Sequence, residues 1–369
     1  MGCAGGGDGH GMPAVIDFEF NNRHGGNLQA AVRRYGIERG DWLDLSTGIA
    51  PWGWPVPSIP ADVWQRLPEA ECPLQQPAAA YYGCDPQAVL AVPGSQFAIQ
   101  TLPTLLSPRR VAIPVLGYFE HRKAWQSAGH QLVNYGENEV ERVDQMIEAG
   151  ALDVVLVINP NNPSAARLEK TRLLKWRESL SQRGGLMIVD EAFMDAAPGE
   201  SLAPACPRSG LVVLRSLGKF FGLAGLRLGF VLGDAGWLQK LQAKLGPWAV
   251  NGPAQYAGSR ALADRDWQRG QRQRLNHWLP LQRQLLESIG RKCGWRVRSG
   301  PLFISLRLAN TQAQTLADHL GQKGILVRRF VGPGAEPGCV RLGLVKDAIQ
   351  LERLQLALEQ FTHCRLQYE

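Results

Sequence analysis

The chain has 369 residues and a net charge of +7, with 45% hydrophobic and 20% charged residues. This length gives one large or two ordinary domains, and the composition excludes a small disulfide-stapled scaffold, a fibrous protein and a disordered chain. The mild positive charge favours anionic partners without selecting nucleic acid. Because the sequence has neither an apolar run long enough for a membrane helix nor a signal-peptide pattern, we expect a cytoplasmic protein with no membrane span.

The cysteines and histidines do not have the spacing of a metal site. The seven cysteines are scattered without a CxxC pair, and the seven histidines show no HExxH pattern. We therefore expect reduced thiols and no bound metal.

In chain order, the N-terminal part is predicted to be irregular. Residues 1–12 are mostly glycine and predict a flexible tail. Residues 13–50 are expected to contribute to the smaller domain and to the active site. The proline-rich segment 51–60 is expected to be a connector.

Residues 51–262 are predicted to form a large α/β domain. Short apolar runs, typical of buried strands, alternate here with amphipathic stretches such as 168–185. This alternation indicates a largely parallel central sheet with helices on its faces. The runs are residues 111–119, 154–163, 186–193, 211–221 and 226–233.

Residues 263–369 are predicted to form a smaller α+β domain. A long Arg/Gln-rich helical stretch comes first, and we expect Pro280 to break or kink it. Strands are expected in 295–299, 302–308, 325–330 and 339–344, with helices around 315–321 and at the C-terminus. The arginines of 265–298 are interpreted as a solvated helix face, so nucleic-acid binding is a remote alternative.

Three polar residues follow predicted strands of the large domain. Asn162 lies in NPNNPS, Asp190 ends the run LMIV, and Lys219 follows LVVLRS. Ligands of open α/β sheets collect where strands end, so we expect an amide, a carboxylate and an amine to converge at one sheet edge.

The segments NPNNPS, IVDEAF and SLGKFFGLAGLRLGF, in this order, resemble the fold-type I pyridoxal-phosphate enzymes of the aspartate aminotransferase superfamily, near histidinol-phosphate aminotransferase. The resemblance implies that Lys219 forms a Schiff base with pyridoxal 5'-phosphate, that Asp190 pairs with the pyridinium nitrogen, and that Asn162 bonds the ring hydroxyl. It also implies a phosphate cup formed by Gly94, Ser95, Gln96, Ser216 and Arg227. GxGxxG and GxxxxGK[ST] loops are absent, so dinucleotide and NTP binding are not expected.

The N-terminal third carries a narrower resemblance. The segments HGGN (24–27), WLDLSTGIAPWGWP (42–55) and GYFEHRKAWQSAGH (117–130) are similar to the threonine-phosphate decarboxylase family of cobalamin biosynthesis. This family converts L-threonine O-3-phosphate to (R)-1-amino-2-propanol O-2-phosphate and carbon dioxide. The resemblance implies that His121 stacks on the cofactor ring, that Arg341 binds the substrate carboxylate, and that His24 and Arg328 bind its phosphate.

Two departures from the aminotransferase pattern bear on the choice between the aminotransferase and the decarboxylase families. Phe193 stands where the aminotransferase branch usually has tyrosine, and DEAF is also seen in the decarboxylase family. Gly48 and Ala50 replace the asparagines of SANINP, so we assign no substrate contact to this loop.

The expected function is pyridoxal-phosphate-dependent decarboxylation of a small phosphorylated amino acid by a homodimer. A histidinol-phosphate-type aminotransferase is the main alternative. The bond that is held perpendicular to the cofactor ring is the one that breaks, Cα to carboxylate in a decarboxylase and Cα to H in an aminotransferase, and the sequence does not show this torsion. A catalytically silent corrinoid-pathway partner protein is an alternative from another class.

Overall fold

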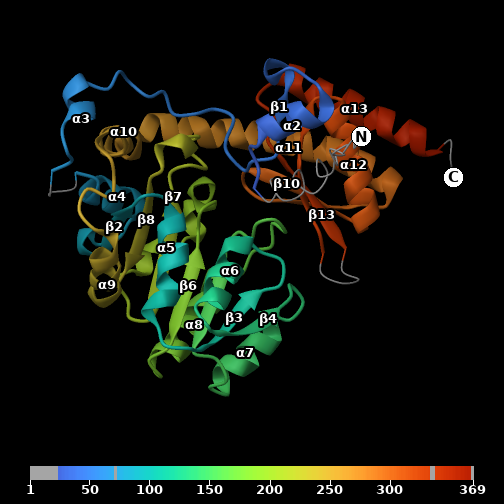
Figure 1. Ribbon diagram of the computed structural model, residues 1–369. Helices are drawn as coiled ribbons and strands as arrows, with labels where there is room; N and C mark the ends of the chain where they lie inside the picture. The colour runs from blue at the N-terminus through green and yellow to red at the C-terminus, as the bar shows by residue number, and fades with distance from the viewer. Residues whose placement is uncertain (1–23, 70–72, 333–336, 367–369) are drawn as a thin grey trace, which may run out of the picture.

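The computed structural model describes residues 24–69, 73–332 and 337–366. The tail predicted for residues 1–12 lies outside these ranges. Figure 1 shows a large domain built around one sheet, a smaller domain beside it, and a long helix, α11 (Arg265–Cys293), that runs from one to the other.

The large sheet has seven strands, and it is mostly parallel as predicted. Only β8 runs antiparallel to both of its neighbours, β2 and β7. Across the sheet the order is β2 (Val89–Val92), β8 (Gly229–Gly233), β7 (Leu211–Ser216), β6 (Leu186–Asp190), β5 (Val154–Ile158), β3 (Arg110–Pro114) and β4 (Gln131–Tyr135).

The central strands β5 and β6 are buried along their whole length, which explains their unbroken apolar runs. Alternate residues face opposite sides, so Val155 and Val157 belong to one apolar cluster and Val154 and Leu156 to another.

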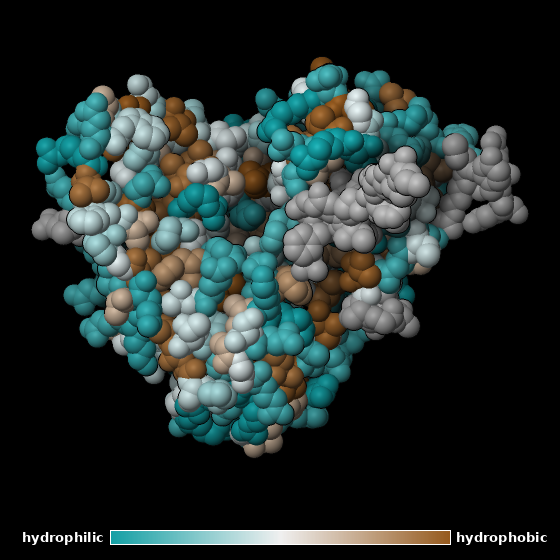
Figure 2. Space-filling view, viewed as in Figure 1, coloured by the Kyte–Doolittle hydropathy of each residue, from teal (hydrophilic) through white to brown (hydrophobic). Residues whose placement is uncertain are grey.

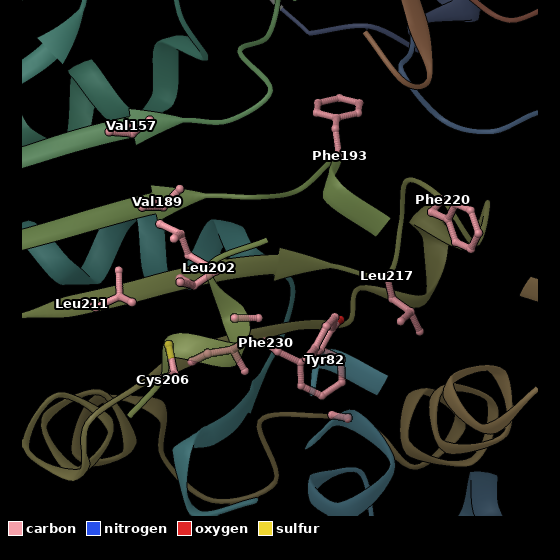
Figure 3. Packing of buried hydrophobic residues seen from close by; sticks show 14 of the residues in the cluster. Tyr82, Val157, Val189, Phe193, Leu202, Cys206, Leu211, Leu217, Phe220 and Phe230 are labelled. Atoms are coloured by element: carbon pink, nitrogen blue, oxygen red, sulfur yellow. The ribbon is translucent and has the colours of Figure 1, made fainter. Parts of the chain in front are cut away.

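Helices cover both faces of the large sheet. On one face lie α4 (Gln75–Tyr82), α7 (Val140–Glu148), α8 (Lys170–Ser181) and α10 (Gly252–Ala263). On the other lie α5 (Ser95–Thr101), α6 (Phe119–Ser127) and α9 (Ala235–Leu245). Figure 3 shows part of the first cluster, in which Phe230 packs beside Tyr82. The cluster also contains Leu217 and Phe220, which lie two residues before and one residue after Lys219.

The smaller domain has an antiparallel sheet in the order β12 (Arg328–Phe330), β13 (Gly338–Gly343), β10 (Phe303–Leu308) and β9 (Arg296–Ser299). The N-terminal strand β1 (Leu43–Asp44) pairs in parallel with β11 (Ile325–Leu326). Leu43 and Leu45 thereby join the apolar cluster of the C-terminal residues. The remaining helices are α2 (Leu28–Tyr35), α3 (Ala61–Gln65), α12 (Asn310–Gln322) and α13 (Ala348–Leu366).

Pro280 was expected to break or kink the long helix, and a break is wrong, because α11 continues through this residue. Proline removes one backbone donor, and packing of α11 against both apolar clusters, through Leu275 and Leu286, offsets that loss. Within the described residues, no helix is long and apolar enough to span a membrane.

Candidate active site

The carboxyl ends of β5, β6 and β7 carry the three residues singled out by the motifs. Asp190 is the last residue of β6, Asn162 follows β5, and Lys219 follows β7. The backbone N–H of Asn159 donates to the carbonyl of Asp190, which ties the loop after β5 to the end of β6. Parallel pairing of adjacent strands therefore places these residues at one edge of the sheet, as expected.

Asp190 is a buried carboxylate held from two sides. Its Oδ1 accepts the backbone N–H of Ala192 at 3.0 Å, and its Oδ2 lies 2.9 Å from Nε2 of His121. Both side chains are almost inaccessible to solvent. A buried carboxylate is stable only when it is hydrogen-bonded, and the bonds to Ala192 and His121 also hold it in one orientation. The stacking role expected for His121 stays a prediction, since the structure records its bond to Asp190.

The amine of Lys219 is desolvated and surrounded mainly by positive charge. Desolvation, together with the nearby Arg341 and Arg227, lowers its pKa to about 8, and Asp190 opposes that shift. Its Nζ lies 5.6 Å from the centre of the Phe193 ring. An amine with this pKa is half in its neutral, nucleophilic form at about pH 8, whereas an ordinary lysine at that pH is almost entirely protonated.

Arg227 lies against the first turn of α5. Gly94 precedes this helix with a φ of 77°, and a Cβ there would approach Nη2 of Arg227 to 2.6 Å. Glycine at this position therefore lets a guanidinium come close to the backbone of Gly94 at the start of α5, and Ser216 is the last residue of β7. Cations, hydroxyls and helix N–H groups suit a phosphate dianion.

The side chain of Gln96, a residue expected in the phosphate cup, is already hydrogen-bonded to other residues. Its Oε1 accepts the hydroxyl of Tyr118 at 3.1 Å, and its Nε2 donates to Glu120 at 3.3 Å. Glu120 in turn lies 3.4 Å from Nε2 of His24. Glu120 therefore links Gln96 of the phosphate cup to His24 of the HGGN loop. The sequence analysis assigned no role to Tyr118 or Glu120, although both lie with His121 in the segment 117–130.

The HGGN segment is shaped by close packing against Ser46. A Cβ on Gly25 would come within 2.3 Å of the Ser46 carbonyl oxygen, and Gly26 has a φ of 88° and donates to Oγ of Ser46 at 2.7 Å. Only glycine fits both positions. The glycine pair therefore places His24 beside Glu120.

Arg341 joins this loop to the large domain. Its Nη2 donates to the carbonyl of Ser46 and its Nη1 to Oδ1 of Asn162, each at 2.6 Å. Since this oxygen is already engaged, Nδ2 is the group of Asn162 that remains to donate to a ligand. Burial lowers the pKa of Arg341 to about 10.

Arg328 is the neighbour of Arg341 in the β12–β13 pairing. It is 8% exposed, and burial together with the charge of Arg341 lowers its pKa to about 9. Nη1 of Arg328 and Nε of Arg341 are buried without a hydrogen-bond partner among the described residues. A buried cation with an unused donor is costly to the protein alone and points to an anionic ligand.

The two departures from the aminotransferase pattern are in contact. A Cβ on Gly48 would lie 2.7 Å from Cε1 of Phe193, so the glycine makes room for the ring. Phe193 also packs edge-on against Phe303 of the small domain. The two positions are therefore coupled by packing.

The residues at this edge fit pyridoxal phosphate. They supply a desolvated amine, a buried carboxylate, an amide donor and an arginine beside a helix start, which suit an aldehyde, a ring nitrogen, a ring hydroxyl and a phosphate respectively. The two orphaned guanidinium nitrogens lie on the small-domain side, where they suit the anionic groups of a substrate.

The family model described as aminotransferase class I and II matches residues 71–358. Threonine-phosphate decarboxylase from Pseudomonas aeruginosa is 47% identical over 92% of this chain and 97% of its own length. Threonine-phosphate decarboxylase from a Sinorhizobium species is 37% identical over 91% of this chain and 97% of its own. The fold is similar to that of histidinol-phosphate aminotransferase from Sinorhizobium meliloti in complex with pyridoxal-5'-phosphate, with a TM-score of 0.77 and 20% identity over 92% of this chain and 95% of that one.

Proposed function

Since this chain belongs to the aminotransferase class I and II family, we propose that it is a pyridoxal-phosphate-dependent enzyme that decarboxylates L-threonine O-3-phosphate. The products are carbon dioxide and (R)-1-amino-2-propanol O-2-phosphate, an intermediate of cobalamin biosynthesis. Relatives that align with this chain over nearly their whole length bear the name of this activity. The observation that carries the substrate class is the buried, unpartnered guanidinium nitrogen of Arg328 beside Arg341.

Residues of the large domain would hold the cofactor. Lys219 would bind its aldehyde covalently, Asp190 would face the ring nitrogen, and Asn162 the ring hydroxyl. His121 would orient Asp190 and lie by the ring. The phosphate would be held by Gly94, Ser95, Gln96, Ser216 and Arg227, with Gln96 contributing its backbone because its side chain binds Tyr118 and Glu120.

When bound, pyridoxal phosphate supplies an electron sink for negative charge that develops at the substrate α-carbon. Asp190 would keep a proton on the ring nitrogen of the bound cofactor, because its carboxylate is buried and oriented by His121. Lys219, with a pKa of about 8, can both accept a proton and return one to the α-carbon near neutral pH.

Residues of the small domain would bind the substrate's two anionic groups. Arg341 would hold the carboxylate and Arg328 the phosphate, with His24 at the rim. The two arginines are adjacent in the sheet, so the groups they hold must be close together, as they are in a short phosphorylated amino acid. Removal of the substrate phosphate leaves Arg328 buried and unpaired, which opposes binding of the unphosphorylated amino acid.

We also propose that the protein acts as a cytoplasmic homodimer. Large apolar side chains are exposed on α3, on the segments that flank it and just before α10: Val56, Trp64, Leu67 and Trp248. A Cβ on Gly252 would lie 2.5 Å from the Val63 carbonyl oxygen, so the segments carrying Trp64 and Trp248 are packed together. Exposed apolar groups gathered in this way are typical of an interaction surface.

The experiment that tests the substrate assignment compares three amines with the holoenzyme. L-Threonine O-3-phosphate should be decarboxylated with a kcat/KM at least about 100-fold above that of L-threonine, and L-histidinol phosphate should give no glutamate from 2-oxoglutarate. Equal rates with threonine and its phosphate would remove Arg328 from the site.

A further inference from the structure

Three glutamines on α11 are buried although the helix surface around them is rich in arginine: Gln268, Gln271 and Gln282. Burying an amide costs free energy unless its hydrogen bonds are made. Each of these side chains makes two or more, and their partners lie in different parts of the molecule. None belongs to the motifs from which the function was inferred.

Gln271 binds the turn that follows Lys219. Its Nε2 donates to the carbonyl of Phe220 at 2.9 Å and to the carbonyl of Trp52 at 3.0 Å. The segments 50–54 and 219–222 run side by side here, since Ala50 donates to the Lys219 carbonyl. The amide of Gln271 is therefore hydrogen-bonded to both the connector and the turn that follows Lys219.

Apolar contacts reinforce this attachment. The ring of Trp267, one turn before Gln271, stacks on Phe221 at 5.5 Å between ring centres, and the guanidinium of Arg272 lies over Phe220 at 5.2 Å. Gly222, at the end of the turn, approaches the connector so closely that a Cβ would lie 2.6 Å from Cα of Gly53. The backbone on either side of this turn thus has little room to shift.

Gln282 binds the strand that carries Arg341. Its Nε2 donates to the carbonyl of Gly343, and its Oε1 accepts from the backbone of Val345, each at 2.9 Å. Gly343 is the last residue of β13, two positions after Arg341, and its own N–H donates to Leu45. The amide is 0% exposed, so water cannot replace these bonds.

We propose that Gln271 and Gln282 are positioning residues, which use the rigidity of α11 to set the separation between Lys219 and Arg341. About three helical turns separate them, which returns both to nearly the same face of the helix. The roles of Lys219 and Arg341 rest on the proposed function. The proposal beyond that function is that one helix, α11, is hydrogen-bonded both to the turn after Lys219 and to the end of the strand that carries Arg341.

Gln268 provides a matched control. It lies on the same helix, is 4% exposed, and donates to the carbonyls of Ala261 and Leu262, each at 3.0 Å. These carbonyls belong to α10 and carry no residue of the site. Replacing Gln268 removes two donations from its amide, as many as replacing Gln271 removes, without touching either half of the site.

The test compares Gln268→Met, Gln271→Met and Gln282→Met as full-length holoenzymes. Three quantities are measured: the thermal unfolding midpoint, the pH midpoint of the cofactor absorbance, and kcat and KM for L-threonine O-3-phosphate. All three variants should unfold at lower temperature. Gln271→Met should shift the absorbance midpoint and lower kcat about 10-fold, and Gln282→Met should raise KM about 10-fold with a smaller effect on the absorbance. Gln268→Met should keep all parameters of the site within about twofold.

If Gln268→Met changes kcat and KM as much as the other two variants do, the glutamines act only through stability, and the proposal is overturned. Wild-type parameters in Gln271→Met and Gln282→Met would overturn it as well. If a methionine variant does not fold, the asparagine variant, which keeps a neutral amide but is one methylene shorter, is held to the same expectations. The absorbance midpoint requires no substrate, so it tests Gln271 even if the wild type does not decarboxylate L-threonine O-3-phosphate.

Discussion

At the scale of single residues, the chemistry depends on an excess of positive charge in a dry pocket. Lys219, Arg328 and Arg341 all have lowered pKa values, for which desolvation is the largest cause. Asp190 is a buried carboxylate whose charge acts in the opposite direction on the pKa of Lys219. The pocket is therefore poised for anionic ligands, and its lysine for reaction with an aldehyde.

The first prediction concerns Lys219. Borohydride reduction of the holoenzyme should attach a pyridoxyl group to Lys219, and Lys219→Ala should lose turnover while it keeps its fold. In the cofactor-free protein, the rate at which added pyridoxal phosphate is trapped should rise with pH through about 8 and then level off, because the neutral amine is the nucleophile. Peptide mapping by mass spectrometry and stopped-flow absorbance provide the measurements.

A label on a different lysine would contradict this assignment. So would a trapping rate that keeps rising far above pH 8, as expected for a solvated lysine.

The second prediction concerns Arg341. A lysine keeps the charge but cannot form the paired hydrogen bonds of a guanidinium, so Arg341→Lys should lower kcat/KM by about 10- to 100-fold, the equivalent of ~1.5 to 3 kcal/mol. Steady-state kinetics would measure the loss. Arg296→Lys, an exposed change on β9, is the control and should behave as the wild type. An unchanged kcat/KM in Arg341→Lys would exclude Arg341 from substrate binding.

At the scale of elements, a buried ion cluster joins β6 to β7 beneath the site. Arg215 of β7 donates to Glu191 at 2.6 Å and also to Asp195, and its guanidinium lies 4.6 Å from the Tyr82 ring centre. All three charged groups are almost inaccessible to solvent. Glu191 directly follows Asp190, and Arg215 directly precedes Ser216, so the cluster braces the ends of the two strands that carry site residues.

The third prediction follows from this burial. Arg215→Met should destabilise the protein by about 3–5 kcal/mol, because two carboxylates would be left buried without their cation. Urea denaturation monitored by circular dichroism gives the free energy of unfolding. Arg283→Met breaks an exposed pair with Glu287 and should cost no more than about 0.5 kcal/mol. Similar losses in the two variants would refute the role given to the cluster.

The sequence predicted the central strands well and the edge strands poorly. β5, β6 and β7 each begin with at least four apolar residues in a row, and each lies within its predicted range. β4 was missed because it lies at the sheet edge and only Tyr135 is buried, so its apolar pattern is weak. The pairing of β1 with β11 joins residues far apart in the chain, which periodicity cannot reveal.

The site was predictable to the extent that its residues stand in motifs. Asp190, Asn162 and Lys219 converge because parallel strands end at a common edge. Glu120 and Gln271 were missed, since a surface glutamate or a glutamine on an Arg-rich helix has no local sign of function. Gln271 meets Trp52 across 219 positions of sequence, and only folding brings them together.

At the scale of the whole molecule, the site lies where two separately packed parts meet. The large and small sheets have their own apolar clusters, and α11 contributes Leu275 to one and Ile289 to the other. On this basis we propose the division into residues 51–262 and 263–369, with the segment 13–50 assigned to the smaller part through its residues 43–45, while residues 13–23 lie outside the described ranges. Figure 2 shows the surface notched between the lobe with α3 and α10 and the lobe with α12 and α13.

The fourth prediction concerns assembly. If the apolar side chains near α3 and α10 lie in a homodimer interface, Trp64→Glu should weaken association by placing a charge there. Sedimentation at several protein concentrations should show a dimer for the wild type and a larger monomer fraction for Trp64→Glu. Ile349→Glu, at an exposed position on α13, is the control and should remain dimeric. A monomeric wild type would contradict the assembly.

The central claim is that the site decarboxylates and does not transaminate. An aminotransferase stalls after one turnover with its cofactor in the pyridoxamine form and needs a keto acid to continue. A decarboxylase returns the proton to the α-carbon and is ready for the next substrate. The direct measurement is carbon dioxide release from L-threonine O-3-phosphate by the holoenzyme without any keto acid. We predict steady release of one carbon dioxide per substrate consumed, whereas a single turnover that resumes only when 2-oxoglutarate is added would contradict the account.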